Sequence, residues 1–258
     1  PAMSIAIALV PSLLFGALSL LLGAFPTDIR RQNTAVMVGA GAVSLGCAAM
    51  LGSPWSLSAT VWGVACGLMW TGGQVFVLWA FRAWGVSRTM PLTTALQLLL
   101  NATLGVSLFG EWRAPGALIL GMVALALIML RAVEVPPAHA VGPMGLGLLA
   151  GAGLCALILP RRAPLRGPRI VPAALAGGLW AVGNALMLRS TAAVGVASGF
   201  TLSQLGFVLA TLGGLTILGE ERTGRERTAV AAGVAAAVVG LVLMGLATGM
   251  DTGASPSQ

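Results

Sequence analysis

This sequence has very few charged residues. Only 8% of its 258 residues are charged, whereas a soluble domain carries about a quarter. So few charges cannot cover a surface that faces water. A disordered chain is excluded as well, because 57% of the residues are hydrophobic. The composition therefore indicates a protein that crosses a membrane several times.

Lysine and tyrosine are absent, so all 14 basic residues are arginine. The arginines lie in short gaps between apolar runs and form no patch for nucleic acid, so no such partner is expected despite the net charge of +7. His139 is the one histidine, and Cys47, Cys66 and Cys155 lack metal or redox spacing. We expect no metal and no cofactor. An enzyme is not expected either, because no nucleophile lies beside a base.

Nine apolar stretches are long enough to cross a hydrocarbon core, which takes about 20 helical residues. They are continuous rather than alternating, which argues against strands. The predicted fold class is all-α, a polytopic transmembrane helix bundle. The nine stretches span residues 4–25, 34–51, 58–81, 90–109, 115–131, 143–160, 170–189, 195–218 and 228–247.

The arginines between these stretches give the two halves opposite orientations. Cytoplasmic loops of membrane proteins are rich in basic residues. In the first half the odd-numbered gaps carry most of the arginines, and in the second half the even-numbered gaps do. The two halves agree only if one crossing is added or lost between Arg131 and Arg161.

An internal repeat leads to the same result. A shift of 110 residues aligns residues 70–74 with 180–184, and after one gap Gly110-Glu111 matches Gly219-Glu220. Inverted repeats with a substrate site at their interface are common in secondary transporters. We predict a first repeat of five helices over 1–133, a second repeat with four visible helices over 134–250, and a polar tail over 251–258.

Three short sequence motifs indicate a known protein family. Residues 85–91 read GVSRTMP and continue to Gln97-Leu98, residues 178–184 read GLWAVGN, and residues 217–220 read ILGE. These stretches resemble the glucose/ribose uptake family of the drug/metabolite transporter superfamily. The resemblance implies a ten-helix inverted-repeat permease that takes up a monosaccharide with proton coupling. It also implies an integral protein of the bacterial cytoplasmic (inner) membrane.

The sequence departs from that family at one place. The family has two helices between its fifth helix and the basic loop that here spans 161–169, whereas this chain shows one. Resemblance, charge parity and repeat arithmetic thus all indicate one missing crossing. We expect family members to be about one helix longer than this chain.

The repeated tryptophan–amide pairs are the first candidate substrate residues. Trp70 and Gln74 are four apart and share a helix face, and Trp180 and Asn184 repeat that spacing. An indole face suits the C–H face of a sugar ring, and an amide hydrogen-bonds its hydroxyls. The alternative is helix packing, in which the amides bond between helices and the glycine before each amide allows close approach.

Polar stripes on two corresponding helices supply further candidates. A stripe of this kind is costly against lipid, so it faces either a central cavity or a neighbouring helix. Lining of a cavity is the preferred interpretation, and plain hydrogen bonding between helices is the alternative. The candidate residues are Thr94, Gln97 and Asn101 in the first stripe and Ser198, Thr201 and Gln204 in the second.

Three charged residues near helix ends are candidates for gating or coupling. Arg88 precedes Pro91 and is either an anchor at the membrane interface or a donor to substrate hydroxyls. Glu111 and Glu220 end equivalent segments, either as solvated charges or as proton-sensitive gates. Because no acidic residue or histidine lies within a segment, a buried carboxylate relay is absent and facilitated diffusion is slightly favoured.

Three functions stay open after these considerations. The first is monosaccharide uptake, and the second is export of a drug-like molecule or metabolite by the same superfamily. The third is a transport-incompetent or accessory membrane protein, because of the missing crossing. The expected partners are a monosaccharide and the lipid bilayer, while protons and a homodimer are open.

Overall fold

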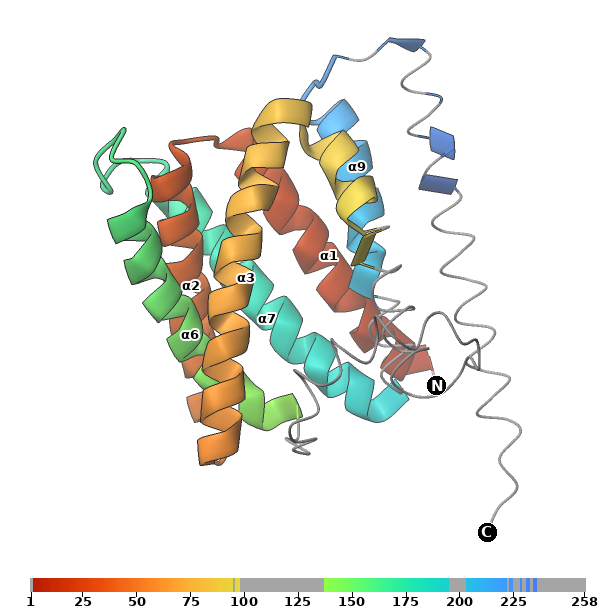
Figure 1. The fold of residues 1–258 in the computed structure, drawn as a ribbon. Coiled ribbons are helices and arrows are strands. Elements are labelled where there is room, and N and C mark those ends of the chain that lie inside the picture. Colours follow the sequence, from red (N-terminus) through yellow and green to blue (C-terminus); the bar gives the residue numbers. More distant parts are fainter. Residues whose placement is uncertain are drawn as a thin grey trace, which may run out of the picture.

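The computed structural model describes residues 2–94, 96–97, 137–194, 203–221, 223–224, 228, 231–232 and 234–235. Within these ranges every regular element is a helix, as the sequence predicts (Figure 1). The predicted count of nine crossings extends outside the described residues. The labelled helices are α1 (Ala2–Ala24), α2 (Ile29–Met50), α3 (Leu57–Trp84), α6 (Pro137–Ile158), α7 (Ile170–Val194) and α9 (Gly206–Thr216).

Four of the described helices are long and apolar enough to cross a membrane. These spans are Ile29–Met50, Leu57–Trp84, Val141–Ile158 and Ile170–Leu188. Large hydrophobic side chains such as Met69, Phe76 and Leu157 are exposed on their outer faces. Because lipid rather than water would cover such side chains, the fold is that of an integral membrane protein.

Helix α2 begins at Ile29, five residues before the predicted start at residue 34. The prediction placed the polar residues of this turn in a gap, but the structure buries three of them and gives each a partner. Arg30 Nε donates to the Ala156 carbonyl at 2.8 Å, and Gln32 Nε2 donates to the Leu22 carbonyl at 2.9 Å. Asn33 Nδ2 lies 3.2 Å from the Cys155 sulfur. Tertiary hydrogen bonds thus stabilise a helical turn that composition alone assigns to a loop.

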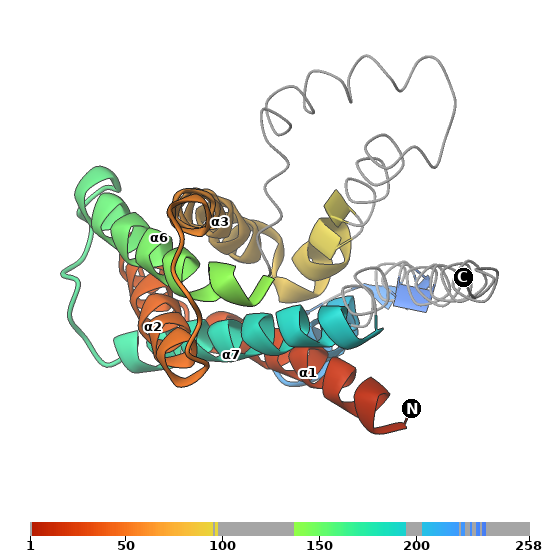
Figure 2. The ribbon, with the colours of Figure 1, turned by 90° about the horizontal axis from the view of Figure 1, so that it is seen from below.

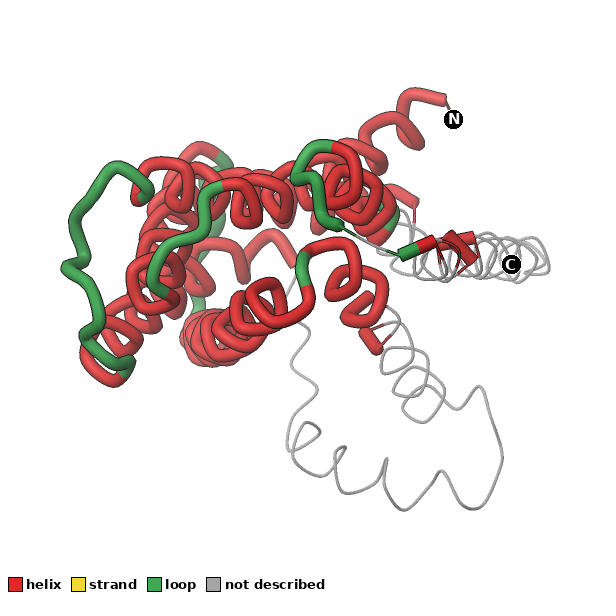
Figure 3. The backbone as a smooth tube through the Cα atoms, turned by 90° about the horizontal axis from the view of Figure 1, so that it is seen from above, coloured by secondary structure: helices red, strands yellow, loops and turns green. Residues whose placement is uncertain are grey.

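Most of the arginines of the described chain gather at one end of the bundle, which we call the arginine end. Arg31 Nε donates to the Pro164 carbonyl at 2.6 Å, and an Arg169 guanidinium nitrogen donates to the Pro26 carbonyl at 2.6 Å. The α1–α2 turn and the segment 159–169 therefore meet there. Figure 3 shows these connections in green.

Equivalent helices of the two predicted repeats run in opposite directions. Helix α2 begins at the arginine end, where α6 finishes, as the Arg30–Ala156 bond shows. Helix α3 finishes at this end and α7 begins there (Figures 1 and 2). Opposite directions are what an inverted repeat requires, while the ten-helix count stays a prediction.

Glycines bring two helix pairs into backbone contact. A Cβ on Gly177 of α7 would collide with the Val36 carbonyl of α2, and one on Gly67 of α3 would lie 2.5 Å from the Met144 carbonyl of α6. The glycines before the two amides behave differently from each other. A Cβ on Gly183 would lie 2.8 Å from the Phe15 ring, whereas nothing lies within 4 Å of one on Gly73. Close approach therefore explains one of those two glycines only.

Candidate functional site

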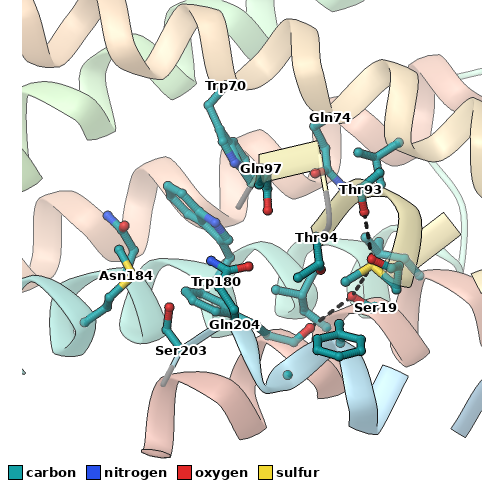
Figure 4. Close-up of a pocket in the computed structure, with 18 of the residues that line it drawn as sticks. Ser19, Trp70, Gln74, Thr93, Thr94, Gln97, Trp180, Asn184, Ser203 and Gln204 are labelled. Carbon is teal, nitrogen blue, oxygen red and sulfur yellow. Dashed lines mark hydrogen bonds between the residues drawn. The ribbon is translucent and has the colours of Figure 1, made fainter. Parts of the chain in front are cut away.

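A cavity of about 310 Å³ lies between the helices of the two halves. Helices α1, α3, α6 and α7, the helix that starts at Val86 and the chain at 203–207 all contribute to its walls (Figure 4). Seven predicted substrate residues line it: Trp70, Gln74, Thr94, Gln97, Trp180, Asn184 and Gln204. The other three, Asn101, Ser198 and Thr201, lie outside the described residues.

The two tryptophans of the repeated pairs stack on each other inside this cavity. Their ring centroids are 3.9 Å apart and their planes are inclined by 27°. The sequence argument treated each indole as a separate surface for a sugar ring. In the structure each ring covers one face of the other, so a sugar ring cannot lie on the two faces that meet. Equivalent positions of the two halves thus meet at the wall of one cavity.

Amides and hydroxyls surround the stacked rings. Gln74, Thr94 and Asn184 are buried side chains of the cavity wall. Asn184 Nδ2 lies 3.7 Å from the Met144 sulfur, a weak acceptor that leaves the amide available for a better partner. The wall can therefore offer both donors and acceptors to a polar ligand.

The structure adds lining residues that the sequence argument missed. Ser19 of α1 is buried in the wall, and its hydroxyl donates to the Phe15 carbonyl at 3.0 Å. Met90 and Phe207 also line the cavity. Ser19 shares a helix face with Ser12, seven residues earlier, but this apolar stretch has no counterpart in the second half, so the repeat argument could not select it.

None of the described lining residues is ionisable. The cavity presents a mixture of indole, thioether, amide and hydroxyl groups. Such a wall suits a neutral polar solute, because a charged ligand would enter a low-dielectric space without a counter-charge.

Glu220 lies outside the cavity and caps a helix of the other half. The Val86 backbone N–H donates to Glu220 Oε1 at 2.6 Å, and the Ser87 N–H donates to Oε2 at 3.2 Å. The Ser87 hydroxyl donates to the same Oε2 atom. A carboxylate at this position compensates the free N–H groups and the positive end of the helix dipole. Glu220 is therefore not a solvated loop charge.

Glycine explains why the cap comes from a distant part of the chain. Gly85 has φ +79° and ends α3, while its N–H donates to the Phe81 carbonyl at 3.0 Å. The next helix starts directly after it, and Gly85 has no side-chain oxygen to serve as the N-cap. Glu220 reaches this position because Gly219, at φ +62°, turns the chain after α9. Arg88 is half-buried in the same first turn and does not line the cavity. Glu111 lies outside the described residues.

Comparison with known proteins identifies a family that matches most of the chain. The profile of the family described as "Sugar transport protein" matches residues 6–133 and 128–247. The chain belongs to this family. This match confirms the sugar permease family that the motifs indicate. Members of the family are transporters rather than enzymes.

Individual relatives align over nearly the whole chain. A candidate sugar uptake protein of Listeria innocua is 31% identical over 96% of this chain and 100% of its own length. The glucose uptake protein GlcU of Bacillus subtilis is 30% identical over 95% of this chain and 99% of its own length. No solved structure matches the chain.

These alignments are longer than the chain itself. The alignment with the Listeria protein spans 289 positions against 258 residues here, so at least 31 positions of it have no counterpart in this chain. A membrane helix with its connecting turn needs about that number. The two stretches of the family match overlap at 128–133, next to the region between Arg131 and Arg161 where charge parity predicts that one crossing is added or lost.

Proposed function

We propose that this chain is a sugar uptake permease for a monosaccharide of the glucose or ribose type, located in the bacterial cytoplasmic membrane. The observation that carries the proposal is the neutral cavity at the junction of the two halves. Its wall combines a tryptophan pair with amides and hydroxyls. Membership of the sugar transport family supports the same assignment.

The size of the cavity favours a small sugar. Ligand pockets of proteins have volumes of about 300–1,000 Å³, and this cavity of about 310 Å³ is at the small end. A single sugar ring fits such a space, whereas an oligosaccharide does not. A drug-like cation is disfavoured, because none of the described lining residues carries a negative charge.

In this proposal the sugar contacts indole and amide together. Its C–H face lies on the outer face or edge of the Trp70–Trp180 pair, and its hydroxyls bond Gln74, Asn184, Gln97 and Gln204. The two repeats contribute equivalent groups from opposite sides. Alternating access then requires only that the two halves tilt about the shared site.

Facilitated diffusion is the proposed mode of transport. A proton relay needs a titratable group at the substrate site, and the described lining residues include none. The carboxylate of Glu220 is engaged at the start of a helix instead. We therefore expect the sugar gradient alone to determine the direction of net movement.

Counterflow in proteoliposomes tests the proposal directly. Purified protein is reconstituted into vesicles that are loaded with unlabelled glucose or ribose, and labelled sugar is added outside. We expect a transient, saturable accumulation of label that protein-free vesicles do not show. Absence of counterflow with every monosaccharide tried would contradict the proposal.

An imposed pH gradient separates the two modes of transport. For facilitated diffusion, the final level of sugar in initially empty vesicles equals the outside concentration with or without the gradient. Accumulation above that level, abolished by a protonophore, would show proton coupling and refute the diffusion mode.

A further inference from the structure

A second cavity lies at the arginine end, separate from the sugar cavity. Its volume is about 260 Å³. It is enclosed by the first turn of α2, the last turns of α3 and the residues that follow α6. The lining residues are Asp28, Ile29, Arg30, Trp79, Arg82, Leu159, Pro160 and Arg162.

Positive charge dominates this cavity. Three arginines face one carboxylate, which leaves an excess of two positive charges. Arg82 is attracted by Asp28 and repelled by Arg162, so the single acid does not neutralise the group. An anion with one or two negative charges would relieve the repulsion between Arg82 and Arg162.

The backbone at this cavity also favours an anion. Helix α2 is 22 residues long, and Asp28 at its N-cap position makes no side-chain capping hydrogen bond. The first N–H groups of a helix and its positive dipole end attract phosphate. Arg30 is held in place by the carbonyls of Ala156 and Ala163, at 2.8 and 3.5 Å. Arg30 is thereby fixed, whereas Arg82 and Arg162 are exposed side chains that border the cavity.

One polar atom in the cavity wall needs a hydrogen-bond donor. Asp28 Oδ2 is buried and has no hydrogen-bond partner. Such an oxygen is costly to leave unpaired, and a hydroxyl on the ligand would satisfy it. The ligand that fits carries both a phosphate and a hydroxyl group.

The outer wall of the cavity faces the lipid side of α3. Trp79 lines the cavity and is 51% exposed, and its ring meets Phe76 edge-on at 5.8 Å between centroids. Aromatic side chains at helix ends are typical of the membrane–water interface. Acyl chains can therefore lie along this face while the headgroup enters the cavity.

We propose that this cavity binds the headgroup of an anionic phospholipid that carries hydroxyls, of the phosphatidylglycerol type. The guanidinium groups of Arg82 and Arg162 bind the phosphate, and Asp28 accepts a hydrogen bond from a glycerol hydroxyl. Basic pockets between transmembrane helices are known to bind anionic headgroups. The site is independent of the sugar cavity and of the substrate proposed for it.

Native mass spectrometry of the detergent-purified protein tests this site, with phosphatidylglycerol and phosphatidylcholine added in parallel. We expect binding of phosphatidylglycerol in preference to phosphatidylcholine. In the double variant Arg82→Gln, Arg162→Gln, that affinity should fall about tenfold or more. The matched control is Arg161→Gln, Arg166→Gln, which removes two exposed charges from the same segment without touching the cavity. Its affinity should stay within about twofold of the original.

Two outcomes would overturn the proposal. In one, both double variants lose affinity equally, which would show general attraction to a basic surface. In the other, glycerol 3-phosphate or inorganic phosphate occupies the site and phosphatidylglycerol shows no preference over phosphatidylcholine, which would show a soluble anion. Circular dichroism and the unfolding temperature establish that each variant is folded, and a misfolded double variant is replaced by Arg162→Gln alone.

Discussion

The stacked tryptophans combine two roles that substitution can separate. If the rings only stabilise the bundle, removing one lowers the unfolding temperature and leaves sugar affinity unchanged. If they bind sugar, Trp70→Ala and Trp180→Ala each raise the sugar concentration that gives half-maximal counterflow by about tenfold. The double variant should be little worse than either single variant, because each ring depends on the other for its position.

Trp55→Ala is the matched control for these two variants. Trp55 is half-exposed at the opposite end from the arginines and does not line the cavity. Its substitution should change the half-saturation concentration by less than about twofold. An equal effect of all three substitutions would rule out the binding role of the pair.

Glu220 gives a second prediction at the residue scale. Glu220→Ala removes the acceptor for the Val86 and Ser87 N–H groups. The free energy of unfolding should fall by about 0.5–2 kcal/mol, as for other helix caps. Glu220→Gln should lose less, because one carbonyl oxygen still accepts a hydrogen bond. The measurement is thermal unfolding in detergent, with the adjacent exposed Glu221→Ala as control; an equal loss there would contradict the capping role.

The sequence identified groups of residues better than it identified contacts. The shift of 110 residues selected both tryptophan–amide pairs, and all four side chains line one cavity. It did not reveal that the indoles cover each other, nor that Glu220 caps a helix far along the chain. Both contacts depend on how the helices are placed in three dimensions, and no spacing along one helix records that placement.

At the scale of helices, α3 offers an internal comparison between two glycines. Gly67 packs against the backbone of α6, and a Cβ there would lie 2.5 Å from the Met144 carbonyl oxygen. Gly67→Ala should therefore destabilise the fold by about 1–3 kcal/mol. Gly72 has no atom within 4 Å of a Cβ position, so Gly72→Ala should be neutral or stabilising by up to about 1 kcal/mol.

Thermal unfolding of both variants in one detergent provides the measurement. Because the two glycines lie on the same helix, differences in helix propensity cancel in the comparison. Equal stability of Gly67→Ala and Gly72→Ala would show that α3 and α6 are not in backbone contact. The length of the apolar stretches predicted these helices, but it did not distinguish a packed glycine from an exposed one, since both occur in apolar surroundings.

Helix boundaries show the limit of the hydropathy argument at this scale. Predicted and observed ends agree closely for α1 and α3, whose flanks are glycine, proline or serine. They differ at α2, α6 and α7, where the helix extends into polar or proline-containing residues. The buried Arg30 and Asn33 each donate a hydrogen bond to α6, and such partners are visible only in the folded molecule.

At the scale of the whole molecule, charge parity and the structure both disagree with nine crossings in simple alternation. Helix α3 finishes at the arginine end, and α6 begins at the opposite end, where a Cβ on Gly142 would lie 2.9 Å from the Trp55 ring. These two helix ends lie on opposite sides of the bundle, whereas nine crossings in simple alternation would place them on the same side. The sequence between α3 and α6 contains two long apolar stretches, 90–109 and 115–131. The alignments with the relatives are longer than this chain, and the missing crossing stays a prediction.

Cysteine labelling in whole cells tests the resulting topology. In a background with Cys47, Cys66 and Cys155 replaced by alanine, single cysteines are introduced as Pro26→Cys, Arg166→Cys and Pro54→Cys. The first two positions lie at the arginine end, which should be cytoplasmic by the positive-inside rule. Both should be protected from a membrane-impermeant maleimide until the cells are opened, whereas Pro54→Cys should react at once. If the chain instead crosses nine times in simple alternation, Pro26→Cys and Arg166→Cys will lie on opposite sides and only one of them will be protected.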